Sequence, residues 1–180
     1  MVKKAKYSVV RTLGRVEVRR YEPMVVARVD SRRGSGFSLL FRYITGENRE
    51  RSKVAMTAPV IGERADAPGG QRIAMTAPVY TQEDSMAFVM PEGYTLDTTP
   101  VPADDRVSIE EVPGRQVAAL RFSGRWTDGV FDTRSDQLLA TLEREGITPV
   151  GPVFSMLYNP PFTPPFLRRN EVAVEVRMDR

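Results

Sequence analysis

A seven-residue phrase occurs twice in this chain and limits how its middle can fold. Residues 54–60 (VAMTAPV) return almost unchanged as residues 73–79 (IAMTAPV), with twelve residues between the two copies. The intervening segment contains Ala-Pro-Gly-Gly at 67–70, which is a dense turn signal. We therefore predict two extended segments folded back on each other around this turn.

The same order of elements is predicted in both halves of the chain. Residues 16–21 alternate with period two, break at Glu22-Pro23 and resume at 24–29, which predicts a tight hairpin. Residues 107–112 and 116–122 repeat this pattern around Pro113-Gly114. Further strands are predicted at 86–90 and 153–158 and at 171–177, where the valines alternate.

One helix is predicted after each hairpin. Ser35 is a candidate N-cap for the first helix, and Gly46 is placed to end it. Thr127 or Asp128 caps the second helix, which ends at Gly146. The apolar residues with helical spacing are Phe37, Leu40, Phe41 and Ile44 in the first helix, and Val130, Phe131, Leu138, Leu139 and Leu142 in the second.

Two copies of hairpin, helix and further strands predict an α+β fold, in which one helix per half covers one face of a curved antiparallel sheet. The two pseudo-symmetric halves span about 15–92 and 106–178, joined by a connector of little regular structure. We expect a single domain over residues 1–180, because neither half has enough covering elements to fold alone. A cleft between the halves is a usual place for a ligand.

The composition excludes several classes of protein. The chain has no histidine and no cysteine, which removes Ser-His-Asp triads, thiolate nucleophiles and two-histidine metal sites. It has no apolar run of about 18 residues and no secretory signal, so we expect no membrane span and a cytoplasmic location. The net charge of +3 comes from basic residues spread along the chain, which does not indicate a nucleic-acid-binding protein.

Several motifs in order resemble the SOUL haem-binding protein family. These are the doubled MTAPV phrase, YEPM at 21–24, FSGRW at 122–126, and YNPP at 158–161 followed by LRRNEV at 167–172. The resemblance implies a distorted antiparallel β-barrel made of two halves. It also implies that haem or another tetrapyrrole binds in a shallow apolar site, for carriage or buffering.

The resemblance places the tetrapyrrole against the first helix and the loop before the last strand. On the helix, Leu39, Arg42 and Tyr43 lie off the stripe predicted to face the sheet, so we expect them to face the ligand, with Arg42 as a propionate partner. The alternative is that Arg42 is an ordinary exposed arginine and that Tyr43 packs under a loop.

The loop at 159–169 contains four prolines, which stiffen it. Its apolar residues must be covered by something, and a planar ring could cover them. The candidates in this loop are Phe162, Phe166, Leu167, Arg168 and Arg169. The alternatives are that the apolar residues fold back onto the barrel, and that Arg169-Asn170-Glu171 pins the loop to the strand.

Haem iron has few possible ligands in this chain. Without histidine or cysteine, only methionine or tyrosine could coordinate it, or no protein group at all. Met56 and Met75 are read as core residues, and Tyr158 as a structural hydrogen-bond donor rather than a phenolate ligand. We therefore expect haem or a metal-free porphyrin as the partner, no metal ligands, and a monomer.

Two other functions remain open. A small-molecule effector-binding or scavenging domain would use the cleft between the halves and would need a buried carboxylate, for which Glu17, Glu110 and Glu111 are the candidates. A tetrapyrrole-modifying enzyme would need a proton donor, and Tyr43 or Tyr158 are the only obvious ones. We expect no enzyme, because no acid and base pair is arranged in the sequence.

Overall fold

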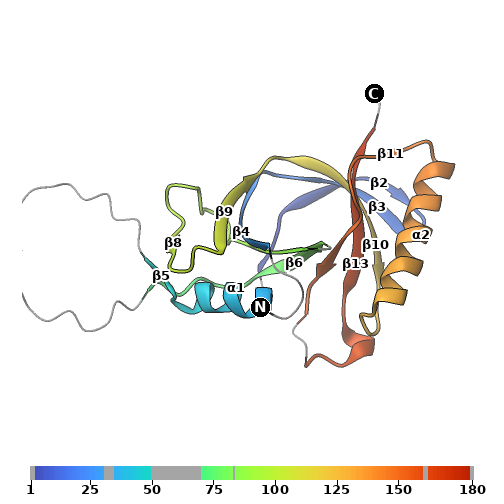
Figure 1. Ribbon diagram of the computed structural model, residues 1–180. Coiled ribbons are helices and arrows are strands. Elements are labelled where there is room, and N and C mark those ends of the chain that lie inside the picture. Colours follow the sequence, from blue (N-terminus) through green and yellow to red (C-terminus); the bar gives the residue numbers. More distant parts are fainter. Residues whose placement is uncertain (1–2, 31–34, 50–69, 83, 160–161, 179–180) are drawn as a thin grey trace, which may run out of the picture.

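The computed structural model describes residues 3–30, 35–49, 70–82, 84–159 and 162–178 (Figure 1). Its elements in chain order are β1 (Lys3–Lys4), β2 (Tyr7–Leu13), β3 (Val16–Tyr21), β4 (Met24–Asp30), α1 (Ser35–Thr45), β5 (Asn48–Arg49), β6 (Thr76–Gln82), β7 (Ser85–Val89), β8 (Val101–Pro102), β9 (Val107–Val112), β10 (Arg115–Phe122), α2 (Asp128–Arg144), β11 (Thr148–Pro149), β12 (Phe154–Leu157), the 3-10 turn η1 (Pro165–Leu167) and β13 (Asn170–Arg177).

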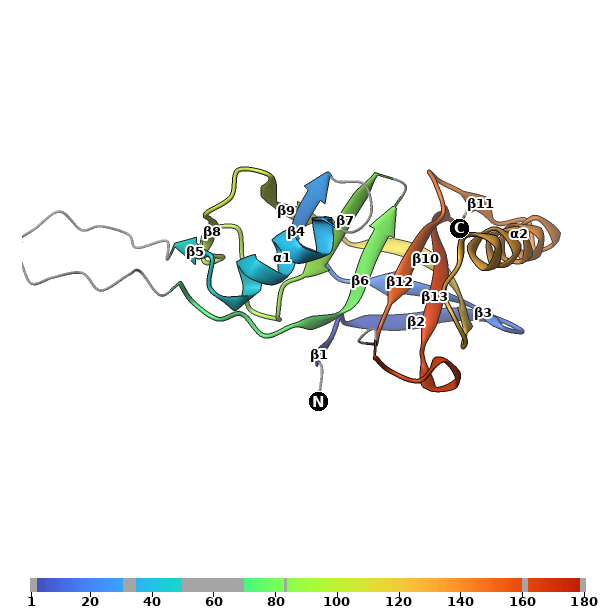
Figure 2. The same ribbon diagram turned by 60° about the horizontal axis from the view of Figure 1, so that its bottom comes forward.

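A single curled sheet forms the body of the molecule. Its strand order is β2-β3-β10-β13-β12-β6-β7-β4-β9, and every pair along this path is antiparallel. Figure 1 and Figure 2 show the sheet as a half-barrel, with α1 against one half and α2 against the other. The predicted α+β fold with one helix per half is confirmed.

The two predicted hairpins are wrong. β3 pairs with β2 and β10, whereas β4 pairs with β7 and β9, so the two strands on either side of Glu22-Pro23 do not pair with each other. The chain bends at this point and passes from one part of the sheet to another. The bend at Pro113-Gly114 lies beside it, since a Cβ on Gly114 would be 3.2 Å from the Tyr21 carbonyl oxygen.

A break of two residues containing proline fits a bend as well as a hairpin turn, because proline fixes φ and removes an amide donor in both cases. When β2 is left out, the strand order reads the same in reverse after β3, β4, β6 and β7 are exchanged with β9, β10, β12 and β13. Such an order is what two related halves require. The pseudo-repeats within one domain, at about 15–92 and 106–178, stay a prediction.

The doubled phrase is described only in part. Its first copy and residues 67–69 of the predicted turn lie outside the described residues, which resume at Gly70. The second copy enters β6 at Thr76. Among the described residues, no helix is long and apolar enough to cross a membrane.

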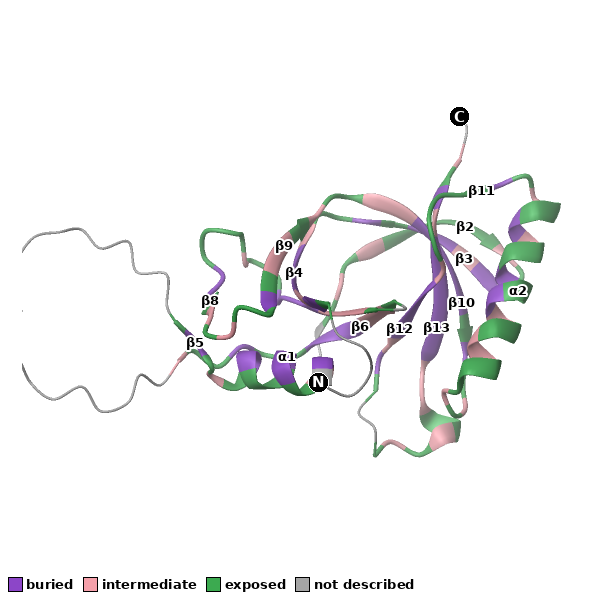
Figure 3. Ribbon diagram, in the orientation of Figure 1, coloured by how far each residue is buried: buried purple, intermediate pink, exposed green. Residues whose placement is uncertain are grey.

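Three apolar clusters hold the fold together. The first lies between α1 and strands β4, β7 and β9, and the second lies between α2 and strands β3, β10 and β13. The third occupies the inner face of the half-barrel and includes Tyr21, Met156 and Ala173. Figure 3 shows β13 buried along most of its length, because α2 covers one face of this strand and the curl of the sheet covers the other.

Candidate functional site

Helix α1 turns a different face to the sheet than the one predicted. Leu39 and Tyr43 are 5% and 1% exposed and belong to the core, whereas Phe41 is 46% exposed. The Tyr43 hydroxyl donates a hydrogen bond to the Pro100 carbonyl oxygen at 2.8 Å. The prediction that Leu39 and Tyr43 face outward is therefore wrong. The buried face contains residues 39 and 43 beside residues 40 and 44. It is therefore rotated about the helix axis by part of a turn from the predicted apolar stripe.

Arg42 remains at the surface of α1, where its side chain is 48% exposed. Its guanidinium lies 3.6 Å from the Glu47 carboxylate and 3.8 Å from that of Asp104, which are long distances for ion pairs. Phe41 and Arg42 are therefore the apolar and cationic groups that this helix presents to solvent. Arg42 has the exposure of an ordinary surface arginine, which was the alternative interpretation.

Three side chains of the loop before β13 point into solvent, and we call them the apolar triad. Phe162 is 87% exposed, Phe166 is 76% exposed and Leu167 is 63% exposed. They do not fold back onto the barrel, so that alternative is wrong. Apolar groups with this much exposure, gathered in one loop, are typical of a surface that receives a partner or a ligand.

The loop that carries the triad is fixed by hydrogen bonds at several points. Its 3-10 turn is bonded to the segment before α2, because the Gly124 amide donates to the Pro165 carbonyl oxygen at 2.9 Å and the Asn170 side-chain amide donates to the Gly124 carbonyl oxygen at 3.0 Å. Arg168 Nε donates to the Thr163 carbonyl oxygen at 2.7 Å. The triad is therefore exposed although hydrogen bonds hold the described part of this loop, residues 162–169, in place.

Arg169 belongs to a buried ionic network and not to the surface of the loop. Its Nε and Nη2 donate to Glu171 Oε1 at 2.9 and 2.7 Å, and its backbone amide donates to Asn159 Oδ1 at 2.6 Å. This arrangement pins the loop to β13, as the alternative interpretation held. Arg169 is thereby committed to a carboxylate inside the protein, which is a correction to its prediction as a propionate partner.

Glu171 is at the centre of this network and is completely buried. Arg19, which is 1% exposed, donates to both of its oxygens, at 2.6 and 3.0 Å, and the Tyr158 hydroxyl donates to it at 3.0 Å. Burial alone would raise the pKa of Glu171, but the hydrogen bonds and charges of Arg19 and Arg169 outweigh burial and lower it. The carboxylate is therefore ionised and fully paired.

Tyr158 is a structural residue, as predicted. Burial raises the pKa of its hydroxyl, and the nearby Tyr21 and Glu171 raise it further. A tyrosine in this environment stays protonated near neutral pH, so it does not supply a phenolate for iron. Its ring also lies under the Arg169 guanidinium, at 4.1 Å from the ring centroid.

The cleft between the halves is largely filled by this network and by the third apolar cluster. A cavity of about 130 Å³ remains at its mouth, lined among others by Tyr80, Arg115 and Phe154. Pockets for drug-sized ligands measure roughly 300–1,000 Å³, so the cleft does not hold a tetrapyrrole. Glu17 and Glu110, two of the three carboxylates proposed for this cleft, are only partly buried, and Glu111 is exposed.

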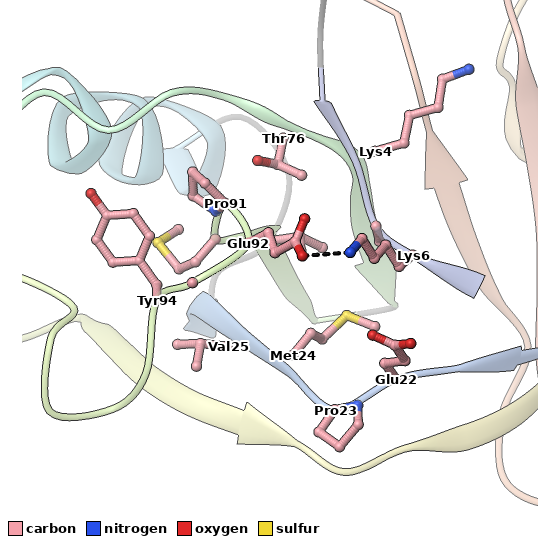
Figure 4. Close-up of a pocket in the computed structure, with 14 residues that line it drawn as sticks. Lys4, Lys6, Glu22, Pro23, Met24, Val25, Thr76, Pro91, Glu92 and Tyr94 are labelled. Atoms are coloured by element: carbon pink, nitrogen blue, oxygen red, sulfur yellow. Dashed lines mark hydrogen bonds and ion pairs between the residues drawn. The ribbon is translucent and has the colours of Figure 1, made fainter.

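A second cavity of about 380 Å³ lies between the N-terminal segment and the chain that follows β7. Figure 4 shows the Lys6 ammonium and the Glu92 carboxylate meeting across it, at 2.5 Å. Lys4 and Glu22 also line this cavity. Two cations and two anions therefore surround an opening that an ion pair crosses. This balance of charges gives no preference for a tetrapyrrole with negatively charged propionates.

Arg19 was not predicted from the sequence, and Glu171 was named only as a residue that pins the loop to the strand, not as a buried carboxylate. The alternation of Val172, Val174 and Val176 marks one buried face of β13, and Glu171 falls on the opposite face. Ala173, in phase with Glu171, is the one sign in this strand that the second face is also closely packed. No group of three or more acidic side chains that could hold a metal ion occurs in the part of the chain that the structure describes.

Comparisons with known proteins agree with this fold. The EcmrR C-terminal domain has a TM-score of 0.56 at 11% identity and covers 96% of this chain and 99% of its own. A hydrolase from Listeria innocua has a TM-score of 0.54 at 14% identity and covers 93% and 94%. Identities this low show a shared fold alone.

A sequence relative and a family model identify the family. The chain is 28% identical over 133 residues to heme-binding protein 1 of Sus scrofa, a match that covers 74% of this chain and 65% of that protein's length. The model of the SOUL heme-binding protein family matches residues 2–175. A match over nearly the whole length, together with the half-barrel and its two helices, shows that the chain belongs to the SOUL haem-binding protein family.

Proposed function

We propose that this protein binds haem or a related tetrapyrrole on its surface, against the apolar triad, and carries or buffers it. The observation that supports this most is the triad itself, whose three large apolar side chains are held in solvent by an ordered loop. Family membership supports the class of ligand, and the small size of the inner cavity supports a surface position.

Covering the triad with a flat ligand removes its apolar surface from water, which favours binding. Burying one large apolar side chain contributes roughly 1.5–3 kcal/mol, and a flat ring system can cover several at once. Because the loop is already fixed by its hydrogen bonds, little conformational entropy is lost when the ligand arrives. None of the three side chains carries a donor atom for iron, so the metal is not needed for this contact.

Cations near the triad can pair with the propionates. Arg168 follows Leu167 directly and is half-buried. Arg125 was not named from the sequence; it is exposed and adjoins Gly124, which is bonded to the 3-10 turn. Arg42 lies on α1, and Figure 2 shows β6 and β12 between that helix and the loop. A tetrapyrrole seated on the triad therefore uses Arg168 and Arg125 before Arg42.

The test is a titration with ferric haem and, in parallel, with metal-free protoporphyrin. The double variant Phe166→Ser/Leu167→Ser should weaken both ligands by about tenfold or more, which corresponds to the loss of one to two apolar contacts. Val9→Ser/Val10→Ser is the matched control, because Val9 and Val10 are also exposed, at 50% and 39%, but lie on β2. Arg42→Glu tests the position on α1.

Three outcomes would contradict the proposal. If haem and protoporphyrin bind no more tightly than they do to an unrelated basic protein, the chain has no tetrapyrrole site. Equal weakening by the β2 control would show that the triad has no special role. A larger loss of affinity in Arg42→Glu than in the triad variant would show that the ligand binds at α1.

The other functions have less support. An effector-binding cleft needs a carboxylate open to a cationic ligand, whereas Glu171 is already paired with two arginines. We expect no catalysis, because the hydroxyls of Tyr43 and Tyr158 are buried and bonded to protein oxygens. A cytoplasmic location and a monomeric state stay predictions.

A further inference from the structure

The cavity of about 130 Å³ at the mouth of the cleft, which we call the mouth cavity, is used neither by the family match nor by the proposed function. Strands β4, β6, β7, β9, β10 and β12 of the half-barrel all contribute to its lining. An apolar cavity of about 150 Å³ in another protein takes up one benzene ring. The mouth cavity therefore has the size for a ligand with a single ring.

The walls of the mouth cavity are largely apolar and aromatic. Ala87 on β7 lies directly opposite Tyr80 on β6, so both side chains are on the same face of the sheet. The rings of Tyr80 and Phe154 have their centroids 5.7 Å apart, at an interplanar angle of 56°. Met24 and Val26 add apolar surface from β4. An aromatic ligand can therefore pack against two rings at once.

The Tyr80 hydroxyl is a hydrogen-bond donor in this wall. Among the described residues its hydrogen-bond partner is the Met24 sulfur, at 3.8 Å. A thioether sulfur is a weak acceptor, and both residues line the cavity and are half-buried. Burial raises the pKa of the Tyr80 hydroxyl, so the hydroxyl keeps its proton near neutral pH. A ligand oxygen or nitrogen that takes the place of the sulfur gains a stronger hydrogen bond.

The charged groups at the rim of the mouth cavity are paired. Arg28 Nε lies 3.2 Å from the Asp30 carboxylate, and Arg28 Nη1 lies 3.8 Å from that of Glu110. Arg115 lies 3.4 Å from the Glu175 carboxylate. Each rim cation thus has a carboxylate beside it, and a charged ligand would compete with these pairs. The rim therefore favours an uncharged ligand.

We propose that the mouth cavity binds an uncharged molecule with one aromatic ring and one hydrogen-bond acceptor. The ring packs against Tyr80 and Phe154, and the acceptor receives the hydrogen bond of the Tyr80 hydroxyl. This site lies on the inner face of the sheet, whereas the apolar triad lies on an exposed loop. Either site can therefore be present without the other.

The probe is benzonitrile, an uncharged single ring whose nitrogen accepts a hydrogen bond. Phenylacetylene has nearly the same shape without this acceptor, benzoate carries a negative charge, and 2-naphthonitrile has a second ring. Binding is followed through backbone amide chemical shifts in NMR titrations. We expect benzonitrile to bind saturably and to shift the amides of β6 and β7. Benzoate and 2-naphthonitrile should bind more weakly, because the first is charged and the second is too large.

Tyr80→Phe keeps the ring and removes the donor. It should weaken benzonitrile about fivefold, as for one neutral hydrogen bond, and should leave phenylacetylene unchanged. In the wild-type complex the C≡N stretch of benzonitrile should lie at higher frequency than in an apolar solvent, and Tyr80→Phe should remove this difference. Tyr94→Phe is the matched control, because the Tyr94 hydroxyl accepts from the exposed Gln71 side chain and does not line the mouth cavity.

A second variant tests the position of the ligand. Ala87→Leu places a larger side chain in the mouth cavity and should abolish the binding of both benzonitrile and phenylacetylene, with urea denaturation to show that the variant is folded. The proposal would be overturned if Tyr80→Phe weakened both ligands equally or neither of them. Full binding in Ala87→Leu, or tighter binding of benzoate than of benzonitrile, would overturn it as well.

Discussion

Replacing Glu171 by glutamine should destabilise the fold more than any other single loss of charge in the described residues. The side chains of Glu171 and Arg19 are 0% and 2% exposed, and Arg169, at 17%, depends on the same carboxylate. Removing one partner of a buried ion pair typically costs about 3–5 kcal/mol, because the remaining charge stays buried without compensation. Glu17 still holds Arg19 at 2.8 Å from the solvent side, so we expect the lower end of this range, about 3 kcal/mol.

The assay is urea denaturation followed by circular dichroism. Against a total stability of about 5–15 kcal/mol for a domain of this kind, such a loss gives a clear shift in the midpoint. Glu175→Gln is the control on the same strand: Glu175 is 41% exposed and pairs with Arg115 at 3.4 Å, so its loss should cost about 0–1 kcal/mol. A cost for Glu171→Gln below about 1 kcal/mol, equal to that of Glu175→Gln, would refute the reasoning.

Three further changes can be measured in the same way. Because Arg19 and Arg169 lower the pKa of Glu171 in the folded state, its stabilising contribution is present above about pH 4.5 and is lost as the pH falls through the lowered value; the wild type should lose more stability on acidification than Glu171→Gln. Leu142→Ala should cost about 2–5 kcal/mol, since Leu142 is fully buried, whereas Leu139→Ala, at a position 36% exposed, should cost much less. Thr127→Ala removes the side-chain oxygen that accepts from the Val130 amide and should cost about 1 kcal/mol.

Elements set by local sequence were predictable, whereas strand pairing was not. The second helix begins at its Thr127 cap and buries Leu138 and Leu142, because capping and helical spacing are local properties. The period-two patterns on either side of Glu22-Pro23 correctly indicate strands. They cannot show whether these strands pair with each other, since that depends on where β9 and β10 lie in the folded protein.

The candidate site was predictable to a similar extent. Exposed apolar residues in a proline-rich loop could be recognised, because proline limits how far such a loop can fold back. The face that α1 turns to the sheet could not be recognised from the sequence. Phe41 and Leu39 are both apolar, and only the position of the sheet decides which of them is buried. The partner of Arg169 was also undetermined, because a buried carboxylate in β13 exists only once the sheet has curled over its second face.

The interior of the half-barrel explains why we place the tetrapyrrole on the outer surface. A cationic ligand in the cleft would have to displace Arg19 or Arg169 from Glu171, and a displaced arginine would then be buried without a partner. An anionic ligand would meet the same carboxylate. The network thus disfavours charged ligands of either sign in the cleft, whereas arginines adjoin the apolar triad on the outer surface, where the propionates of a tetrapyrrole can pair with them and stay in contact with water.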